Sequence, residues 1–350
     1  MKTVATIAVY ALLCGLSALF ALPFLWMVSS GFKDMETIFE YPPTLLPMET
    51  STTISHGRHV PVGIHAPAGI PPRRVAILDR RPGEMRVSAL PPGKSEMKIS
   101  SLPSGDTDAG EWVPNVSVKL ERHVHFRWEN YPAAWNSEPF TRYTFNTLII
   151  TALGILGQTL TASLVAFGFA RLEWPGRKFL FLLVLATMML PAEVTMIPSF
   201  LIFRQLGWID TFLPLIAPSF LGGGAFSIFL FRQFFLTLPR ELDDAARVDG
   251  CGSFGVYWFI LMPLCKPILA TIAVFSFVAH WNDFLTPLIY LNSSDNFTLA
   301  VGLRFFQGAY GTDMHLLMAA STLTLLPVLV VFFFGQKYFV RSIVMSGVKG

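Results

Sequence analysis

Residues 143–170 read YTFNTLIITALGILGQTLTASLVAFGFA, a stretch without a single acidic or basic side chain. A helix of about 20 largely apolar residues is long enough to cross the hydrocarbon core of a bilayer. The same test selects five further runs in the chain, at about residues 4–30, 178–203, 211–235, 260–290 and 314–336. We therefore predict an all-α polytopic membrane protein with six transmembrane helices.

The composition of the whole chain agrees with this class. Of its 350 residues, 53% are hydrophobic and only 14% are charged, and the mean hydropathy is +0.53. These values argue against a soluble enzyme, a disordered chain or a disulfide-stapled secreted domain. A formal charge of +3 gives no reason to expect a nucleic-acid partner. The three cysteines, Cys14, Cys251 and Cys265, lack metal-ligand spacing and are expected to be reduced thiols.

The distribution of basic residues orients the predicted helices, because short cytoplasmic loops carry an excess of Lys and Arg. Ten basic residues lie on one side of the membrane in this arrangement, namely Lys2, Arg171, Arg177, Lys178, Arg232, Arg240, Arg247, Lys337, Arg341 and Lys349. The short loops of the other side hold only Arg204 and Arg304. Both termini are therefore expected in the cytoplasm. The first run is too long for the apolar part of a cleaved signal peptide, which spans about 7 to 15 residues, so it is interpreted as a retained span.

The segment at 32–142 is then extracytoplasmic. Segments longer than about 60 residues cross the membrane largely regardless of their charge. Short runs at 74–78, 85–90 and 116–120 contain β-branched residues in partial alternation, which favours strands. The sequence RPGE at 81–84 suits a hairpin turn. We expect a small β-rich domain outside the membrane.

Two motifs suggest chemistry but are incomplete. The stretch PPGKS at 91–95 resembles the end of a phosphate-binding loop, yet position 88, where the first glycine of that loop belongs, is Ser88. Five histidines cluster in the extracytoplasmic segment, namely His56, His59, His65, His123 and His125. They are not accompanied by cysteines or by ordered carboxylates, so no metal site is predicted. The chain is expected to catalyse no reaction.

Polar side chains within or beside the predicted spans are Gln158, Glu193, His280, Asn282 and Asp283. Glu193 lies between Pro191 and Pro198, where a broken helix leaves backbone groups that must be satisfied inside protein. One interpretation is a solute pathway formed by Glu193, Asn282 and Asp283, since polar groups at membrane depth usually face a cavity. The alternative is that these residues lie at the outer interface, where water satisfies them. The sequence leaves both open.

The stretch LPRELDDAARVDG at 238–250 predicts a short helix that stops sharply. Pro239 suits the first turn of a helix, and Gly250 can adopt the left-handed conformation that ends one. The positive end of the helix dipole is complemented by three acidic residues, Glu241, Asp243 and Asp244. Ala245 and Ala246 are expected to leave a flat face that another surface can approach. The whole elbow at 237–259 therefore suits docking to a soluble partner.

These residues resemble a known signature. Asp244-Ala-Ala-xxx-Gly250, nine further residues and Ile260-x-Met-Pro263 are similar to the EAA motif of membrane subunits of bacterial ABC importers, with Asp in place of Glu and Met in place of Leu. Further stretches place the resemblance in the maltose-type, carbohydrate-uptake branch, including Trp281-Asn-Asp-Phe284 and the terminal Gln336-Lys-Tyr-Phe-Val-Arg341. The resemblance covers the first span and residues 135–350. An insertion at about 45–125 falls outside it.

The resemblance implies an organisation of the chain and a set of partners. Combined with the predicted spans and their orientation, it gives a first helix at 1–31, an extracytoplasmic segment at 32–142, a permease core at 143–336 and a cytoplasmic tail at 337–350. The implied partners are a second homologous permease, two copies of a cytoplasmic ATPase, an extracytoplasmic solute-binding protein and the bilayer. The chain itself would hold no cofactor, because the ATPase binds ATP and Mg²⁺. The implied location is the bacterial cytoplasmic (inner) membrane.

The resemblance also assigns roles to residues. Docking to the ATPase would be carried by Glu241, Asp244, Ala245, Ala246, Asp249 and Gly250. The tail residues expected to contact the ATPase are Gln336, Lys337, Lys349 and Gly350. The binding protein would contact the loops near 204–212 and 291–313.

Two other functions remain open on the sequence alone. One is a membrane-anchored binding or sensing protein whose outer β-rich domain does the work. The other is an ion-coupled secondary transporter, for which internal inverted repeats would be expected.

Overall fold

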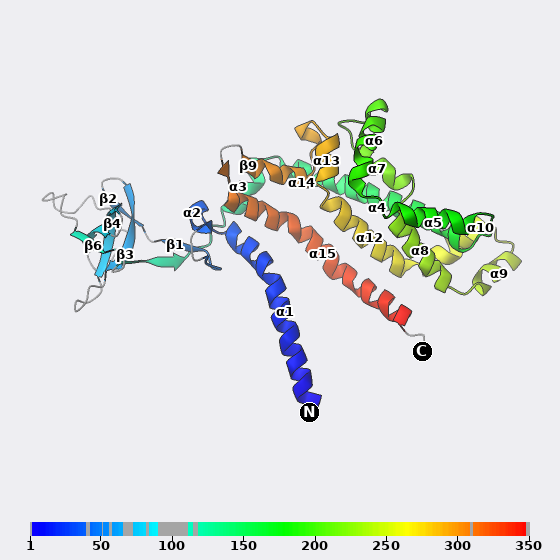
Figure 1. Cartoon of the computed structure of the whole chain (residues 1–350), viewed down its shortest axis with the longest axis horizontal. Helices are drawn as coiled ribbons and strands as arrows, with labels where there is room; N and C mark the ends of the chain where they lie inside the picture. The colour runs from blue at the N-terminus through cyan, green and yellow to red at the C-terminus, as the bar shows by residue number, and fades with distance from the viewer. Residues whose placement is uncertain are drawn as a thin grey trace. The chain divides into compact units, whose positions relative to one another are not determined.

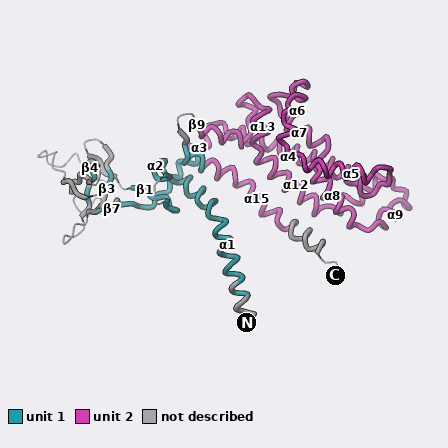
Figure 2. The backbone as a smooth tube through the Cα atoms, in the orientation of Figure 1, with its two compact units in different colours: residues 1–132, 313–319 teal, residues 133–312, 320–350 magenta. Residues whose placement is uncertain are grey.

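The computed structural model describes residues 2–39, 43–50, 52–55, 58–65, 73–81, 84–89, 111–114, 118–308 and 311–347. The chain forms two compact units, residues 1–132 with 313–319 and residues 133–312 with 320–350, which are coloured separately in Figure 2. The first unit holds the N-terminal helix and most of the strands, and the second holds most of the other helices (Figure 1).

The first unit begins with helix α1 (Lys2–Gly31), whose segment Val9–Gly31 is long and apolar enough to cross a membrane. None of that segment's most apolar window is buried within the chain, so its side chains are available to lipid or to another protein. A short helix, α2 (Met35–Ile38), follows. The amide of Asn130 donates to the carbonyl oxygens of Gly31 at 3.0 Å and Lys33 at 2.9 Å. These bonds connect the end of α1 to the start of α3, which begins at Asn130.

The strands of the first unit lie between Met48 and Val124. They are β1 (Met48–Thr50), β2 (Thr52–Ser55), β3 (Arg58–His65), β4 (Arg73–Arg81), β5 (Glu84–Ala89), β6 (Glu111–Pro114), β7 (Val118–Leu120) and β8 (Arg122–Val124). The larger sheet has the antiparallel order β2-β3-β4-β5-β6, with β7 also paired to β3. Separately, β1 pairs with β8, and Met48 lies opposite Val124.

The second unit is helical apart from the small hairpin formed by β9 (Gln307–Gly308) and β10 (Gly311–Thr312). Helix α3 (Asn130–Ser137) begins in the first unit and ends in the second. The helices of the second unit as far as α9 are α4 (Phe140–Ala170), α5 (Arg177–Thr187), α6 (Ala192–Gln205), α7 (Leu213–Phe220), α8 (Ala225–Thr237) and α9 (Glu241–Val248). After α9 come α10 (Ser253–Gly255), the π-helical η3 (Val256–Leu261), α11 (Met262–Leu264), α12 (Lys266–Trp281), α13 (Leu285–Tyr290) and α14 (Leu299–Gly302). Helix α15 (Met314–Gly347) begins in the first unit and continues through the second.

Helix α4 is the centre of the second unit and packs against α7, α8 and α12 (Figure 1). The small residues Ala162 and Ala166 of α4 are fully buried, and small side chains let helix backbones approach closely in membrane proteins. The core around them includes Phe231 and Phe235 of α8 together with Tyr257 of η3. This core therefore joins the end of α4 to α8 and η3, which lie before and after α9 in the chain.

Four helical segments of the described chain pass the length and composition test for crossing a membrane, Val9–Gly31, Phe140–Ala170, Leu213–Thr237 and Met314–Lys337. Two bent pairs pass it jointly, with bends of 97° between α5 and α6 and of 79° between Ser253–Leu264 and α12. The runs predicted at 178–203 and 260–290 are therefore not single straight helices. Proline explains the positions of both bends, because Pro191 precedes α6 and Pro267 lies in the first turn of α12.

Candidate functional site

The elbow helix α9 forms as its local sequence requires. Three acidic side chains lie in its first turn, where they complement the positive end of the helix dipole. At the other end Gly250 has φ of +83°, which confirms the predicted left-handed stop. The N–H of Gly250 donates to the carbonyl oxygen of Arg247 and that of Cys251 donates to the carbonyl oxygen of Ala246. This pair of bonds ends the helix in a Schellman arrangement.

The two faces of α9 differ in exposure. Glu241, Asp244, Ala245, Asp249 and Gly250 are exposed, as a docking surface requires. Ala246 is buried in the core beneath α9, which differs from the expectation that both alanines form one open face. Sequence analysis also missed Val248, which is apolar yet 87% exposed. Its position near the helix stop, between the charged residues Arg247 and Asp249, was the available signal.

A buried ion pair attaches α9 to the rest of the unit. Arg171 follows the last residue of α4, and only 3% of its side chain is exposed. Its Nη2 donates to the carbonyl oxygens of Phe235 at 2.7 Å and Leu238 at 2.9 Å, at the end of α8. Its Nη1 lies 3.3 Å from Oδ2 of Asp243 in α9. A hollow of about 320 Å³ beside this pair is lined mainly by charged residues, among them Asp244.

Two of the predicted tail residues, Gln336 and Lys337, lie in the C-terminal part of α15, which continues as a helix to Gly347. Gln336 is exposed, and its amide donates to the carbonyl oxygen of Phe333 one turn earlier at 3.2 Å. Lys337 follows it on the same helix and is also exposed. Lys349 and Gly350 lie outside the described residues.

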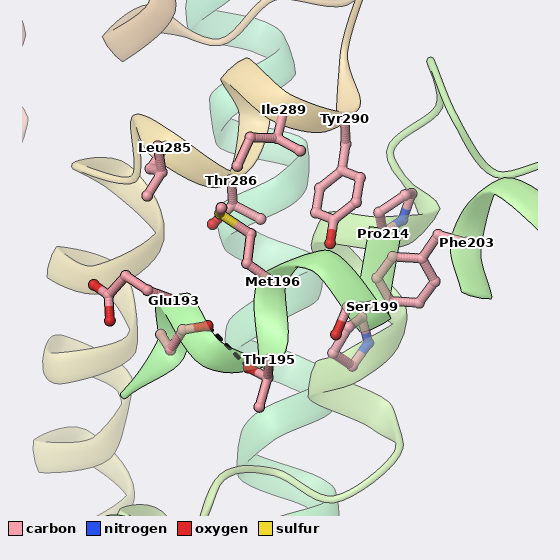
Figure 3. Close-up of a pocket in the computed structure, with 12 residues that line it drawn as sticks. Glu193, Thr195, Met196, Ser199, Phe203, Pro214, Leu285, Thr286, Ile289 and Tyr290 are labelled. Atoms are coloured by element: carbon pink, nitrogen blue, oxygen red, sulfur yellow. Dashed lines mark hydrogen bonds between the residues drawn. The ribbon is translucent and has the colours of Figure 1, made fainter. Parts of the chain in front are cut away.

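A pocket of about 310 Å³ lies between α6, α7 and α13. Its walls combine hydroxyl groups with aromatic and proline rings, and they are formed by Ala192, Glu193, Thr195, Met196, Ser199, Phe203, Pro214, Pro218, Leu285, Thr286, Ile289 and Tyr290. The rings of Phe203 and Tyr290 pack edge to face, with centroids 5.4 Å apart. Figure 3 shows Glu193 apart from these rings, toward the opposite side of the pocket.

The other two predicted pathway residues do not line this pocket. The side-chain amide of Asn282 donates to the carbonyl oxygen of Val278 at 2.9 Å, at the end of α12. The carboxylate of Asp283 accepts from the backbone N–H of Thr286 at 3.2 Å, at the start of α13. Both side chains thus bond the backbone at helix ends, where free polar groups need partners.

The span Leu213–Thr237 is interrupted between α7 and α8 by three successive glycines, Gly222 to Gly224. Gly223 has φ of +64°, and a Cβ there would lie 2.5 Å from the backbone nitrogen of Ala162 in α4. The hydroxyl of Thr161 donates to the carbonyl oxygen of Ser219 at 2.8 Å. Helix α4 therefore packs directly on the break and satisfies one of the carbonyl groups that precede it.

Two further polar residues within the spans bond to elements around this break. The amide of Gln158 donates to the hydroxyl of Ser227 in α8 at 2.7 Å. The ring of His280 lies with Nδ1 at 2.8 Å from the carbonyl oxygen of Ser276 and Nε2 at 3.4 Å from the hydroxyl of Ser219. These polar side chains therefore connect helices α4, α7, α8 and α12.

A second polar cluster joins the loop between α6 and α7 to the loop after α13. The carboxylate of Asp210 accepts from the backbone N–H groups of Asn292 and Ser293, each at 2.9 Å, from the Ser293 hydroxyl and from the Asn296 amide. The Asp210 N–H donates to the carbonyl oxygen of Tyr290 at 2.8 Å. The Ser293 hydroxyl and these N–H donors hold the pKa of the Asp210 carboxyl well below its usual range.

The phosphate-loop and histidine motifs noted in the sequence lie partly outside the described residues. Within the described ranges, His, Cys, Asp and Glu form no group of three or more that could hold a metal ion. The stretch at 91–95 and His56 lie outside those ranges. The three cysteines are free thiols.

Comparison with known proteins places these features in context. Residues 158–345 match the family model described as "Binding-protein-dependent transport system inner membrane component". The arabinooligosaccharides transport system permease protein AraQ of Bacillus subtilis is 38% identical over 227 residues, which cover 64% of this chain and 79% of that protein. The sn-glycerol-3-phosphate transport system permease protein UgpE of Yersinia enterocolitica is 35% identical, over 63% of this chain and 80% of that protein.

A solved structure shares the fold over nearly the whole chain. It is a crystal structure of a bacterial ABC transporter involved in the import of the acidic polysaccharide alginate, with a TM-score of 0.63 at 21% identity. The similarity covers 95% of this chain and 95% of that one.

Proposed function

Because the chain belongs to the family of binding-protein-dependent transport system inner membrane components, it is a permease subunit of an ABC importer, and we propose that its solute is a carbohydrate. The elbow helix α9, with its exposed acidic face and its glycine stop, is the observation that carries the transport role. The similarity to the AraQ and UgpE proteins, whose names specify arabinooligosaccharides and sn-glycerol-3-phosphate, supports a carbohydrate or a related polyol phosphate. Family membership sets aside the sensor and secondary-transporter hypotheses.

The proposed topology has six spans and two cytoplasmic termini in the bacterial inner membrane. Its support is the excess of Lys and Arg on one side of the predicted spans, together with the four long apolar helices and the two bent pairs. The strands between Met48 and Val124 would then form an extracytoplasmic insertion between the first two spans. Four regions follow from this topology, namely a first helix at 1–31, an outer segment at 32–142, a core at 143–336 and a tail at 337–350.

The proposed ATPase-docking surface is the outer face of α9. Glu241, Asp244, Asp249 and the apolar Val248 project from it, and Ala246 supports it from beneath. A neighbouring soluble subunit would bury Val248 and pair its own basic groups with the carboxylates. ATP and Mg²⁺ would be bound by that subunit. Gln336, Lys337, Lys349 and Gly350 would extend this contact from the tail.

The proposed solute pathway runs past the pocket between α6, α7 and α13. Its hydroxyl groups can exchange hydrogen bonds with a sugar, and its aromatic rings can pack against the apolar face of a sugar ring. Glu193 is the pathway residue that lines this pocket, and Asn282 and Asp283 would act at the neighbouring helix ends.

The proposed assembly contains a second homologous permease, two copies of the ATPase and an extracytoplasmic binding protein. The surface proposed for the binding protein is formed by the loops near 204–212 and 291–313, which Asp210 connects.

Gentle extraction of the chain from its native membrane through a C-terminal tag, followed by mass spectrometry, tests the assembly. We expect a second permease and an ATPase to co-purify, and we expect sugar-loaded binding protein to stimulate ATP hydrolysis in proteoliposomes. If the chain purifies alone both with an N-terminal tag and with a C-terminal tag, the result contradicts the proposal. If the complex assembles but its ATP hydrolysis is stimulated by another class of solute and by none of a panel of carbohydrates, only the substrate assignment is contradicted.

A further inference from the structure

Arg171 connects three helices, α4, α8 and α9. It directly follows α4, it donates to two carbonyl oxygens at the end of α8, and it pairs with Asp243 in the first turn of α9. Its side chain is 3% exposed and that of Asp243 is 9% exposed. Charges buried to this extent require partners, because removing one member leaves the other uncompensated in a poorly solvated site.

The geometry of the pair shows that it is more than a bridge between two side chains. The last carbonyl groups of a helix lack partners within the helix, and a cation there is favourable. At the end of α8, the Nη2 group of Arg171 supplies both a hydrogen-bond donor and a positive charge. The Nη1 group of the same side chain faces Asp243. Arg171 Nε and Asp243 Oδ1 are buried and lack hydrogen-bond partners within the described chain, so the ion pair is not bidentate. The guanidinium therefore holds α9 against the backbone of α8.

A second ion pair between the same segments provides a contrast. Arg240 Nη1 lies 3.4 Å from Glu173 Oε1, and the two side chains are 59% and 74% exposed. Exposed pairs of this kind contribute little, because water and salt screen them and both side chains lose conformational freedom. Of the two ion pairs, the buried Arg171–Asp243 pair is therefore the one that contributes to holding α9 in place.

We propose that Arg171 is a positioning residue that makes the elbow helix α9 move as one body with the cytoplasmic-side ends of α4 and α8. The inference rests on the proposed function, in which the ATPase docks on α9, and it adds that movement of the docked ATPase displaces this helix. The connections between α8 and α9 and between α9 and α10 are short and contain Pro239 and Gly250. Without Arg171, displacement of α9 would be absorbed at these connections. With it, the displacement reaches the spans that pack on the Gly222 to Gly224 break.

Hydrogen exchange on the purified chain, without any ATPase, tests whether Arg171 fixes α9 to α4 and α8. In the Arg171→Gln variant we expect the amides of residues 241–250 to exchange at least about tenfold faster than in the wild type. Asp243→Asn keeps the shape of the side chain and is expected to act in the same direction. Glu173→Gln is the matched control at the exposed pair and should exchange like the wild type. Wild-type exchange rates in both buried-pair variants would overturn the proposal.

The assembled importer tests the consequence for transport. We expect Asp243→Asn to retain the co-purifying ATPase and its hydrolysis while the solute taken up per ATP falls about tenfold, because the helix docks but transmits less of its motion. Glu173→Gln should keep the wild-type ratio. An unchanged ratio in Asp243→Asn would refute the positioning role. If the wild type recruits no ATPase, the proposed function fails, and the exchange measurement still decides whether Arg171 fixes α9.

Discussion

Ser293 donates two hydrogen bonds to Asp210, one from its backbone N–H to Oδ1 at 2.9 Å and one from its hydroxyl to Oδ2. The two residues belong to loops that are far apart in sequence, so the contact fixes one loop against the other. Asp210 also adopts φ of +61°, an uncommon conformation for a residue with a side chain. The cluster therefore holds the surface proposed for the binding protein in one arrangement.

Replacing Asp210 should loosen both loops. We expect Asp210→Ala to lower the local opening free energy by about 1 kcal/mol, so that the amides of Asn292 and Ser293 exchange roughly fivefold faster. Binding-protein stimulation of ATP hydrolysis should fall, while the hydrolysis rate without binding protein stays unchanged. Asp295→Asn is the control, because Asp295 is exposed in the same loop and pairs with Arg142 at the surface. Equal exchange in the Asp210 and Asp295 variants would contradict this role.

The same cluster predicts a pH dependence. Since the pKa of the Asp210 carboxyl is lowered in the folded chain, its contribution is complete above the ordinary Asp pKa of about 3.9 and is lost as the pH falls toward the lowered value. Exchange protection of the Ser293 amide, corrected for intrinsic rates, should therefore be equal at neutral and mildly acidic pH and should decline only at lower pH. In Asp210→Ala this decline should be absent. A loss of protection in the wild type near neutral pH would be inconsistent with the assignment.

The glycine break between α7 and α8 predicts sharply different effects at adjacent positions. Gly223→Ala introduces a Cβ that overlaps the backbone of Ala162 and imposes a left-handed conformation on a residue with a side chain. We expect it to cost about 2 to 4 kcal/mol, measured as a lower midpoint of thermal unfolding in detergent. Gly222→Ala has open space around the new atom and should change the midpoint far less. Equal midpoints for the two variants would exclude the close packing of α4 on the break.

The stop of α9 depends on backbone conformation alone. A Cβ at Gly250 would meet no atom within 4 Å, but its φ of +83° disfavours any residue with a side chain by about 1 kcal/mol or more. Gly250→Val should therefore reduce uptake more than Gly250→Asn, because Asn tolerates this conformation better. Gly252→Ala is the control, since Gly252 has φ of −72° and open space. Full energised uptake by Gly250→Val would rule out a strict requirement for the stop.

Val248 tests the docking face directly. Burying this exposed side chain in a partner would contribute about 2 kcal/mol, so Val248→Asp should weaken ATPase binding roughly thirtyfold. Val248→Ile keeps an apolar side chain and should bind like the wild type. The measurement is the dissociation constant of the ATPase for the permease pair in nanodiscs. Unchanged binding of Val248→Asp would place the contact elsewhere.

Local features of the molecule were predictable because they depend on neighbouring residues. The uniform apolar run at 143–170 predicted α4, which begins only a few residues earlier, at Phe140. The first-turn acids and Gly250 predicted the limits of α9. The bend beside Glu193 was harder to locate. Pro191 and Pro198 both signal a break, yet the chain bends only between Thr187 and Ala192 and α6 continues through Pro198.

Features that depend on distant residues were not predictable. Nothing in the spacing of Arg171 and Asp243 indicates that they pair, because a basic residue after a span is ordinarily interpreted as an orientation signal. Burial of Ala246 also escaped prediction, since the core that receives it is formed by Phe235, Tyr257 and other residues of separate helices. The periodicity of α9 identifies two faces but does not specify which one the rest of the chain covers.

The pairing of β1 with β8 has a consequence for how such a chain can evolve. Met48 and Val124 lie opposite each other in an antiparallel pair, so the polypeptide departs and returns about 5 Å apart. Whatever lies between these points can be exchanged, shortened to a turn or replaced by a foreign module without moving the end of α1 or the start of α3, because insertions are tolerated where the ends of a segment meet. A lineage could thus gain or discard residues 51–121 in a single recombination event and keep a working pore.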